Sequence, residues 1–191
     1  MSIKYTKKKV NKNKIIKKKI LSNERIKFIS KCKINISDRD KYNDIVLVSI
    51  PKPYNDEYIF RAQIRAMVSW KNFTDNIYTF GSESYIPEVC DLLNIRNIKK
   101  IKTTKDGTPF LSDAIKQIHN MFPDKPVAFI NSDIIISDPE KIRQIIENIC
   151  IYEKKFILMS QCYNIPENIA DALCEDIISG SKVDFDDNWI R

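Results

Sequence analysis

Short runs of β-branched and other apolar residues alternate with segments of helical periodicity. The runs that predict strands lie at 45–50, 76–80, 98–101, 127–130 and 156–159. Between them, apolar side chains recur three or four positions apart, as on an amphipathic helix, at 56–70, 85–93, 109–121 and 138–149. Strands that alternate with helices in this way are typical of βαβ units, whose strands pair in parallel. The pattern predicts an α/β fold: a Rossmann-like parallel sheet with helices on both faces.

The predicted strands end in polar or turn-forming residues, and parallel sheets bind ligands beyond the carboxyl ends of their strands. These residues are Pro51 and Lys52 after the first strand, Gly81, Ser82 and Glu83 after the second, Lys105 in the loop after the third, and Asn131, Ser132 and Asp133 after the fourth. This edge of the sheet is therefore the candidate ligand site.

The Asn131-Ser132-Asp133 triplet interrupts an apolar stretch, VAFINSDIII at 127–136. One interpretation is a metal site, because Mg²⁺ and Mn²⁺ bind one or two carboxylates and complete their shell with phosphate and water oxygens. The other is a turn whose polar residues cap the next segment. The spacing alone leaves both interpretations open.

Several common types of site are excluded because the sequence lacks the residues that they need. The chain has only three glycines, so it carries neither a dinucleotide-binding glycine motif nor a phosphate-binding P-loop. Its single histidine, His119, lies inside a predicted helix. We expect His119 to be a surface residue rather than a member of a catalytic triad. Arg61 and Arg65 lie four apart on one helical face, where they either reach a phosphate or form a solvated surface.

The positive charge of the chain is concentrated at its start. Residues 1–40 hold 14 Lys and Arg against three Asp and Glu, whereas residues 41–191 hold 18 against 22. Such a lysine-dense segment repels itself, so we expect residues 1–40 to be a largely disordered tail before a domain at 41–191. The tail is either a solubilising arm or a polybasic contact for an anionic membrane, a nucleic acid or a protein partner.

The cysteines indicate a reducing compartment. Five are scattered without a C-x-x-C pair, and no apolar stretch approaches the roughly 20 residues of a transmembrane helix. We therefore expect a soluble, intracellular protein without a disulfide framework, in the cytoplasm or in a virion. The frequent Lys, Ile and Asn residues suggest an A+T-rich genome, such as that of a giant DNA virus.

Five stretches, in this order, resemble nucleotide-diphospho-sugar transferase-like proteins of the GT-A glycosyltransferase fold. They are RAQIRAMVSW (61–70), IYTFGSESYIPEV (77–89), GTPFL (107–111), VAFINSDIII (127–136) and FDDNW (185–189). The resemblance covers residues 45–190. It implies that Asn131-Ser132-Asp133 matches the Asp-x-Asp motif, with Asn131 in place of the first Asp. Asp133 would then hold a Mn²⁺ or Mg²⁺ that bridges the two phosphates of a UDP- or GDP-linked sugar.

The resemblance also implies roles for the other residues at the strand ends. Pro51, Lys52, Gly81, Ser82 and Glu83 would line the nucleoside pocket. Ser112 and Asp113 would face the ribose or the donor sugar, although polar residues are also common in the first turn of a helix. Lys105 would supply a positive charge for the phosphates.

Two departures limit this comparison. Residues 160–164 read SQCYN where the family carries an Arg-Trp-Asp-like cluster, and the sequence ends at Arg191. We therefore expect the domain to lack the portion that binds the acceptor, and we assign neither a catalytic base nor an acceptor. The expected function is a metal-dependent glycosyltransferase; the alternatives are a catalytically silent binding or structural module of the same fold and a nucleotidyltransferase.

Overall fold

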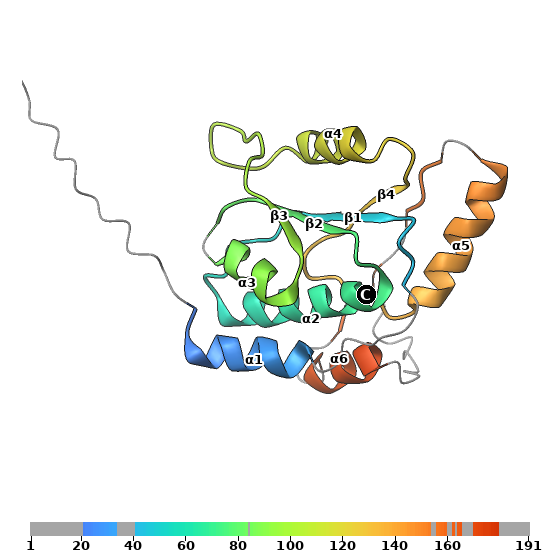
Figure 1. The fold of residues 1–191 in the computed structure, drawn as a ribbon. Helices are drawn as coiled ribbons and strands as arrows, with labels where there is room; N and C mark the ends of the chain where they lie inside the picture. Colours follow the sequence, from blue (N-terminus) through green and yellow to red (C-terminus); the bar gives the residue numbers. More distant parts are fainter. Residues whose placement is uncertain are drawn as a thin grey trace, which may run out of the picture.

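A four-stranded, all-parallel sheet forms the centre of the protein. The computed structural model describes residues 21–33, 41–83, 85–153, 156–159, 162, 164–165 and 170–179. The strands are β1 (Val46–Ser49), β2 (Ile77–Phe80), β3 (Arg96–Ile98) and β4 (Val127–Phe129), in the order β3-β2-β1-β4. The helices are α1 (Asn23–Lys33), α2 (Glu57–Phe73), α3 (Ile86–Leu93), α4 (Leu111–Met121), α5 (Pro139–Tyr152) and α6 (Ala170–Ser179). The predicted α/β fold with helices on both faces is confirmed (Figure 1).

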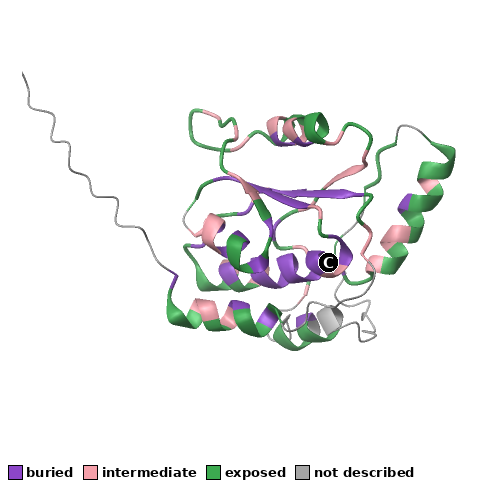
Figure 2. Ribbon diagram, viewed as in Figure 1, coloured by how far each residue is buried: buried purple, intermediate pink, exposed green. Residues whose placement is uncertain are grey.

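The alternation of side chains along β1 creates a core on each face of the sheet. Val46 and Val48 pack on the side of α4, together with Ala114 and Ile118. Leu47 belongs to the larger core, which contains the buried residues of α2 and α3. Figure 2 shows the buried residues concentrated on the central strands and along α2. The sheet therefore needs α4 on one side and α2 with α3 on the other.

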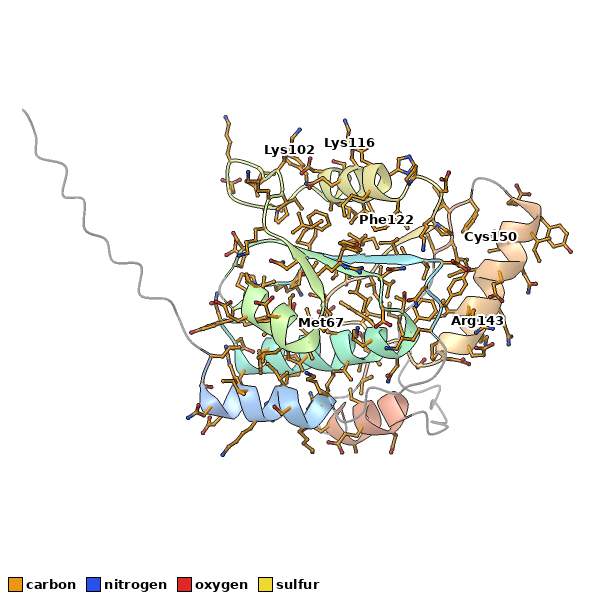
Figure 3. The ribbon with its side chains drawn as sticks, in the orientation of Figure 1. Met67, Lys102, Lys116, Phe122, Arg143 and Cys150 are labelled. Atoms are coloured by element: carbon orange, nitrogen blue, oxygen red, sulfur yellow. The ribbon has the colours of Figure 1, made fainter. Side chains whose placement is uncertain are left out.

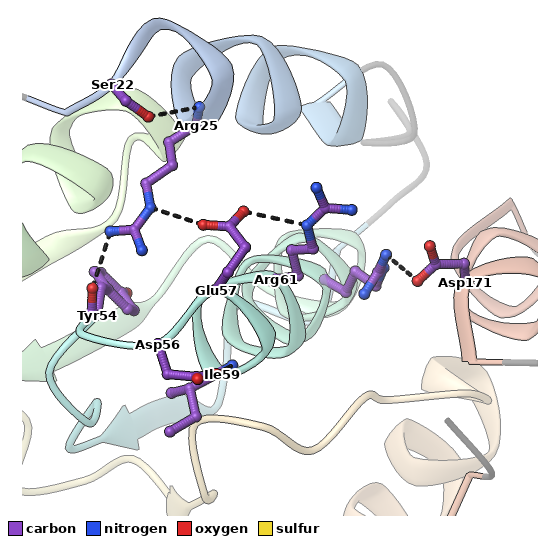
Figure 4. Close-up of polar contacts among 9 residues, drawn as sticks. Ser22, Arg25, Tyr54, Asp56, Glu57, Ile59, Arg61 and Asp171 are labelled. Carbon is purple, nitrogen blue, oxygen red and sulfur yellow. Dashed lines mark hydrogen bonds and ion pairs between the residues drawn. The ribbon is translucent and has the colours of Figure 1, made fainter. Parts of the chain in front are cut away.

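A further layer, formed by α1 and α6, covers the side of α2 that faces away from the sheet (Figure 1). Arg25 of α1 donates to the Glu57 carboxylate at 3.0 Å and to the Tyr54 carbonyl oxygen at 2.9 Å (Figure 4). Arg65 of α2 forms an ion pair with Asp171 of α6. These contacts hold both outer helices on α2.

Helix α1 lies inside the range 1–40 that the sequence assigned to a tail. Its Ile29 and Cys32 are buried in the larger core, so this part of the range is folded against α2. The rest of the predicted tail, residues 1–20 and 34–40, lies outside the described residues, as do its proposed contacts with anionic partners. The FDDNW stretch at 185–189 also lies outside them.

Two predicted strands differ from the structure. The third spans Arg96–Ile98 rather than 98–101, because Arg96, Asn97 and Ile98 are the residues that pair with β2. The predicted fifth strand at 156–159 is wrong: these residues form no strand, and Ile157 is 91% exposed. Apolar residues with a high strand propensity form a strand only where a neighbouring strand pairs with them, and among the described residues no strand pairs with 156–159.

The predicted helices are confirmed with shifted ends. The first extends from Glu57 to Phe73, and the carboxylate of Asp56 caps it by accepting from the Ile59 N–H at 3.0 Å. The last extends to Tyr152, and Asp138 caps it through the Lys141 N–H at 2.9 Å. Asp138 is therefore the N-cap residue of α5.

Candidate functional site

The order of the strands places a topological switch point between β1 and β4. From β1 the chain continues outward through β2 and β3 and then returns to the other side of β1 as β4. In doubly wound sheets, ligands bind outside the carboxyl ends of the two strands where the order reverses. Here these ends lead into the loop that contains Lys52 and into the loop that contains Asp133.

Lys52 is held in place through its backbone by a buried glutamine. Gln63 of α2, which is 1% exposed, accepts from the Lys52 N–H at 3.0 Å and donates to the Lys52 carbonyl oxygen at 3.2 Å. Pro51 and Pro53 on either side restrict the backbone further. The first loop of the site is thus fixed to α2, while the Lys52 side chain extends into solvent.

The second loop is also held by α2. The indole N–H of Trp70 donates to the Ile134 carbonyl oxygen at 2.8 Å, and the hydroxyl of Ser69 accepts from the Ile136 N–H at 3.0 Å. Ile136 is buried in the larger core. The isoleucines that follow the polar triplet therefore anchor the loop that presents Asp133.

The two loops meet in an ion pair. The ammonium nitrogen of Lys52 lies 3.3 Å from Oδ2 of Asp133, and these side chains are 64% and 42% exposed. Ser132, between the exposed Asn131 and Asp133, is buried. The Asn131 carbonyl oxygen accepts from the Ile134 N–H at 3.1 Å, which closes a turn around the triplet. The triplet therefore forms a turn, but the next helix is capped by Asp138 rather than by a residue of the triplet. The turn presents the charged side chain of Asp133 at the switch point.

The residues after β2 form a neighbouring part of the same edge. Gly81 is buried at φ +121°, a backbone conformation that favours glycine. The side-chain amide of Asn97 in β3 donates to the Gly81 carbonyl oxygen at 3.1 Å, so β3 supports this turn. Ser82 and Glu83 are exposed. Within the described residues, no hydrogen bond or ion pair joins Gly81, Ser82 or Glu83 to the Lys52–Asp133 pair.

Two other candidates lie at the loop before α4. Lys105 is part of this loop, and Asp113, in the first turn of α4, binds it. The Asp113 carboxylate accepts from the Lys102 N–H at 2.9 Å and from the Gln117 side-chain amide at 2.9 Å (Figure 3 labels Lys102). The hydrogen bond from the Lys102 backbone is the main cause of the lowered pKa of Asp113. Asp113 thus holds the loop to α4. Lys105 is exposed in the turn of this loop, and Ser112 is exposed in the first turn of α4.

The two arginines considered for phosphate binding are used in packing. Arg61 donates to Glu57 at 3.2 Å, and its guanidinium lies 5.0 Å from the centre of the Phe28 ring. Arg65 pairs with Asp171 and lies over the same ring at 5.2 Å. Both therefore contribute to the contact of α2 with the outer helices. His119 is exposed on α4, as predicted.

The sequence interpretation missed Gln63. Phe60, Ile64 and Met67 define the inward face of α2, and Gln63 shares this face by helical spacing. A polar side chain on an apolar helical face must find hydrogen-bond partners when it is buried. That signal was present in the sequence, although the partner could not be read from it.

The donor atoms around Asp133 do not fit a firmly held divalent cation. Among the described residues, no three His, Cys, Asp or Glu side chains come together, so a cation here would depend on Asp133 and on oxygens of its ligand or of water. The remaining exposed polar side chain of the triplet, Asn131, is neutral, and the positive charge of Lys52 already lies 3.3 Å from Asp133. A divalent cation on this carboxylate would be repelled by that ammonium group. The Mn²⁺ or Mg²⁺ implied by the resemblance stays a prediction.

Comparisons of the chain with models of known protein families, with characterised proteins and with solved structures found no match. Within the described part of the chain, no helix has both the length and the apolar character that crossing a membrane requires.

Proposed function

We propose that this chain binds a nucleotide-diphosphate sugar between the carboxyl ends of β1 and β4 and transfers the sugar to an acceptor. The observation that carries the proposal is the Lys52–Asp133 pair, which lies at the topological switch point on two loops held by α2. An ammonium group at this position suits the phosphates of a UDP- or GDP-linked donor. The resemblance to GT-A glycosyltransferases is the reason for proposing that the transferred group is a sugar.

Binding of the donor without transfer is a second candidate function. Two of the three carboxylates at the predicted site are already engaged, Asp133 by Lys52 and Asp113 by Lys102 and Gln117. Both carboxylates thus already accept hydrogen bonds from this chain, and we assign neither as the base that would accept a proton from an acceptor hydroxyl. This arrangement favours a module that holds the donor.

Calorimetry on the full chain tests the proposed function. UDP- and GDP-sugars are titrated with Mn²⁺ and, separately, with EDTA, and release of nucleoside diphosphate is then followed with sugar, peptide and hydroxylysine acceptors. We expect at least one donor to bind. Release that requires an acceptor would support transfer, and binding without release would support the second candidate. Absence of donor binding in both buffers would overturn both.

A further inference from the structure

We infer that Lys52, rather than a divalent cation, supplies the positive charge that binds the phosphates of the ligand at this site. The inference rests on the proposed function, because it concerns the same ligand and the same edge of the sheet. It assigns Asp133 a different role from that of a metal ligand: Asp133 positions the Lys52 ammonium group over the β1–β4 crevice.

The charge balance of the site supports this role for Lys52. The contact pair consists of one ammonium group and one carboxylate, so it carries no net charge. Metal sites for nucleotide phosphates use one or two carboxylates to offset part of the charge of the cation. Here the only carboxylate of the triplet is offset by Lys52, and the first position of the triplet is the neutral Asn131.

The backbone contacts of Lys52 support the same conclusion. A lysine that binds phosphate acts as a point charge on a flexible side chain. Its contribution to binding therefore depends on where the backbone places the start of that side chain. Gln63 fixes both polar backbone groups of Lys52 at 3.0 and 3.2 Å. Asp133 then holds the exposed ammonium group toward the second loop. The charge is thus positioned before the ligand arrives, which lowers the cost of ordering it on binding.

Ligand binding has a defined consequence for the pair. A phosphate oxygen is an acceptor for the same ammonium group, so it shares or replaces the contact with Asp133. The Asp133 carboxylate is then a negative charge beside a negatively charged ligand. A metal ligand at this position would be essential for binding, whereas a positioning carboxylate opposes the ligand once the ligand is bound.

Calorimetry of the full chain with UDP and GDP, in EDTA and in Mn²⁺, separates these roles. We expect binding in EDTA with an affinity within about threefold of that in Mn²⁺. Lys52→Ala should weaken binding in EDTA at least about tenfold. Asp133→Asn should increase the affinity in EDTA, because it removes the negative charge beside the bound phosphates while the amide oxygen of Asn can still accept from the Lys52 ammonium group. The matched control is Lys116→Ala, since Lys116 is exposed on the outer side of α4 (Figure 3) and should not affect the affinity.

The opposite results have distinct meanings. Binding of UDP or GDP that needs Mn²⁺ and is lost in Asp133→Asn would overturn the inference and leave the proposed function standing. Binding in EDTA that Lys52→Ala does not weaken would overturn the assignment of Lys52. If neither nucleotide binds the parent chain in either buffer, both the inference and the proposed function fail. Thermal unfolding of each variant shows whether a loss of affinity reflects a loss of folding.

Discussion

At the scale of single residues, the geometry of the site depends on buried polar side chains of α2. Gln63 holds Lys52, while Ser69 and Trp70 hold the segment after Asp133. Ser49, at the end of β1, is also buried, and its hydroxyl has no hydrogen-bond partner among the described residues. A buried polar group without a partner is costly, and the fully satisfied Gln63 avoids this cost by binding both backbone groups of Lys52. The loops that carry the exposed charges of the site are thus held by buried residues.

Gln63→Met should therefore destabilise the protein and release the backbone of Lys52 from α2. Methionine fills a similar volume but leaves the Lys52 N–H and carbonyl oxygen without partners, so we expect the free energy of unfolding to fall by about 1–3 kcal/mol. Denaturant unfolding measures this loss. Gln144→Met is the control, because Gln144 is an exposed residue of α5 whose side chain donates to Glu140 on the same helix. Equal stabilities of the two variants would contradict the role of Gln63.

Asn131→Asp should make UDP binding depend on metal, in contrast to the metal-independent binding that we expect of the parent. A second carboxylate gives the site a net negative charge, so UDP binding should weaken several-fold in EDTA and recover in Mn²⁺. Calorimetry in the two buffers measures both effects. Asn120→Asp, on an exposed residue near the end of α4, is the matched control. If Asn131→Asp binds UDP as the parent does in both buffers, the charge balance that we assign to the site is wrong.

At the scale of secondary-structure elements, α2 connects the site to the outer helices. It faces the sheet on one side, holds both loops of the site, and carries α1 and α6 on the other side. The approximate ranges of β1, β2 and β4, and of the helices α2 to α5, were predictable, because hydrophobic periodicity is a local signal. Helix α1 was not assigned, although Ile26, Ile29 and Cys32 recur every third residue, because the lysines around it favoured a tail.

The contacts that form the site were not predictable for a physical reason. The positions of Lys52 and Asp133 at strand ends followed from the sequence, since strands end at proline and polar residues. Their contact depends on the pairing of β1 with β4, which joins segments about 80 residues apart. The engagement of Asp113 by Lys102 likewise depends on how one loop folds onto α4. Apolar character alone also overpredicted a fifth strand at 156–159.

Ile29→Ala should show that α1 is part of the folded body. Ile29 is 1% exposed in the larger core, and truncation of a buried isoleucine to alanine costs about 2–5 kcal/mol. Denaturant unfolding of the full chain measures the loss, with Lys27→Ala on the exposed side of α1 as the control. An Ile29→Ala variant as stable as the control would indicate that α1 does not pack on α2.

At the scale of the whole molecule, the accessibility of the cysteines differs between the packed helix faces and the surface. Cys32, Cys90 and Cys174 are buried in α1, α3 and α6, whereas Cys150 and Cys162 are exposed. Burial is the main cause that raises the pKa of Cys90 and of Cys174 to about 11. Since the thiolate is the reactive form, the buried thiols are protected both by poor access and by a low thiolate fraction.

Thiol labelling should therefore occur in two phases. At about pH 8, Cys150 and Cys162 should react first, and Cys90 and Cys174 should react at least about a hundredfold more slowly, because a pKa of about 11 leaves little thiolate. Burial raises the pKa of Cys32 as well, so Cys32 should also react more slowly than the exposed cysteines. Mass spectrometry after timed labelling identifies the modified residues, and labelling in denaturant provides the reference for full reactivity. Rapid modification of Cys32 or Cys174 in the native protein would show that the outer layer of α1 and α6 is open.

The central claim is that the ligand site lies between the carboxyl ends of β1 and β4, with Lys52 as its positive charge. A crystal structure of the full chain with UDP in the presence of EDTA tests this claim most directly. The account predicts a UDP phosphate within hydrogen-bond distance of the Lys52 ammonium group, with the Gln63 hydrogen bonds to the Lys52 backbone intact. A phosphate bound elsewhere, for example at the lysines between Lys99 and Lys105, would contradict it.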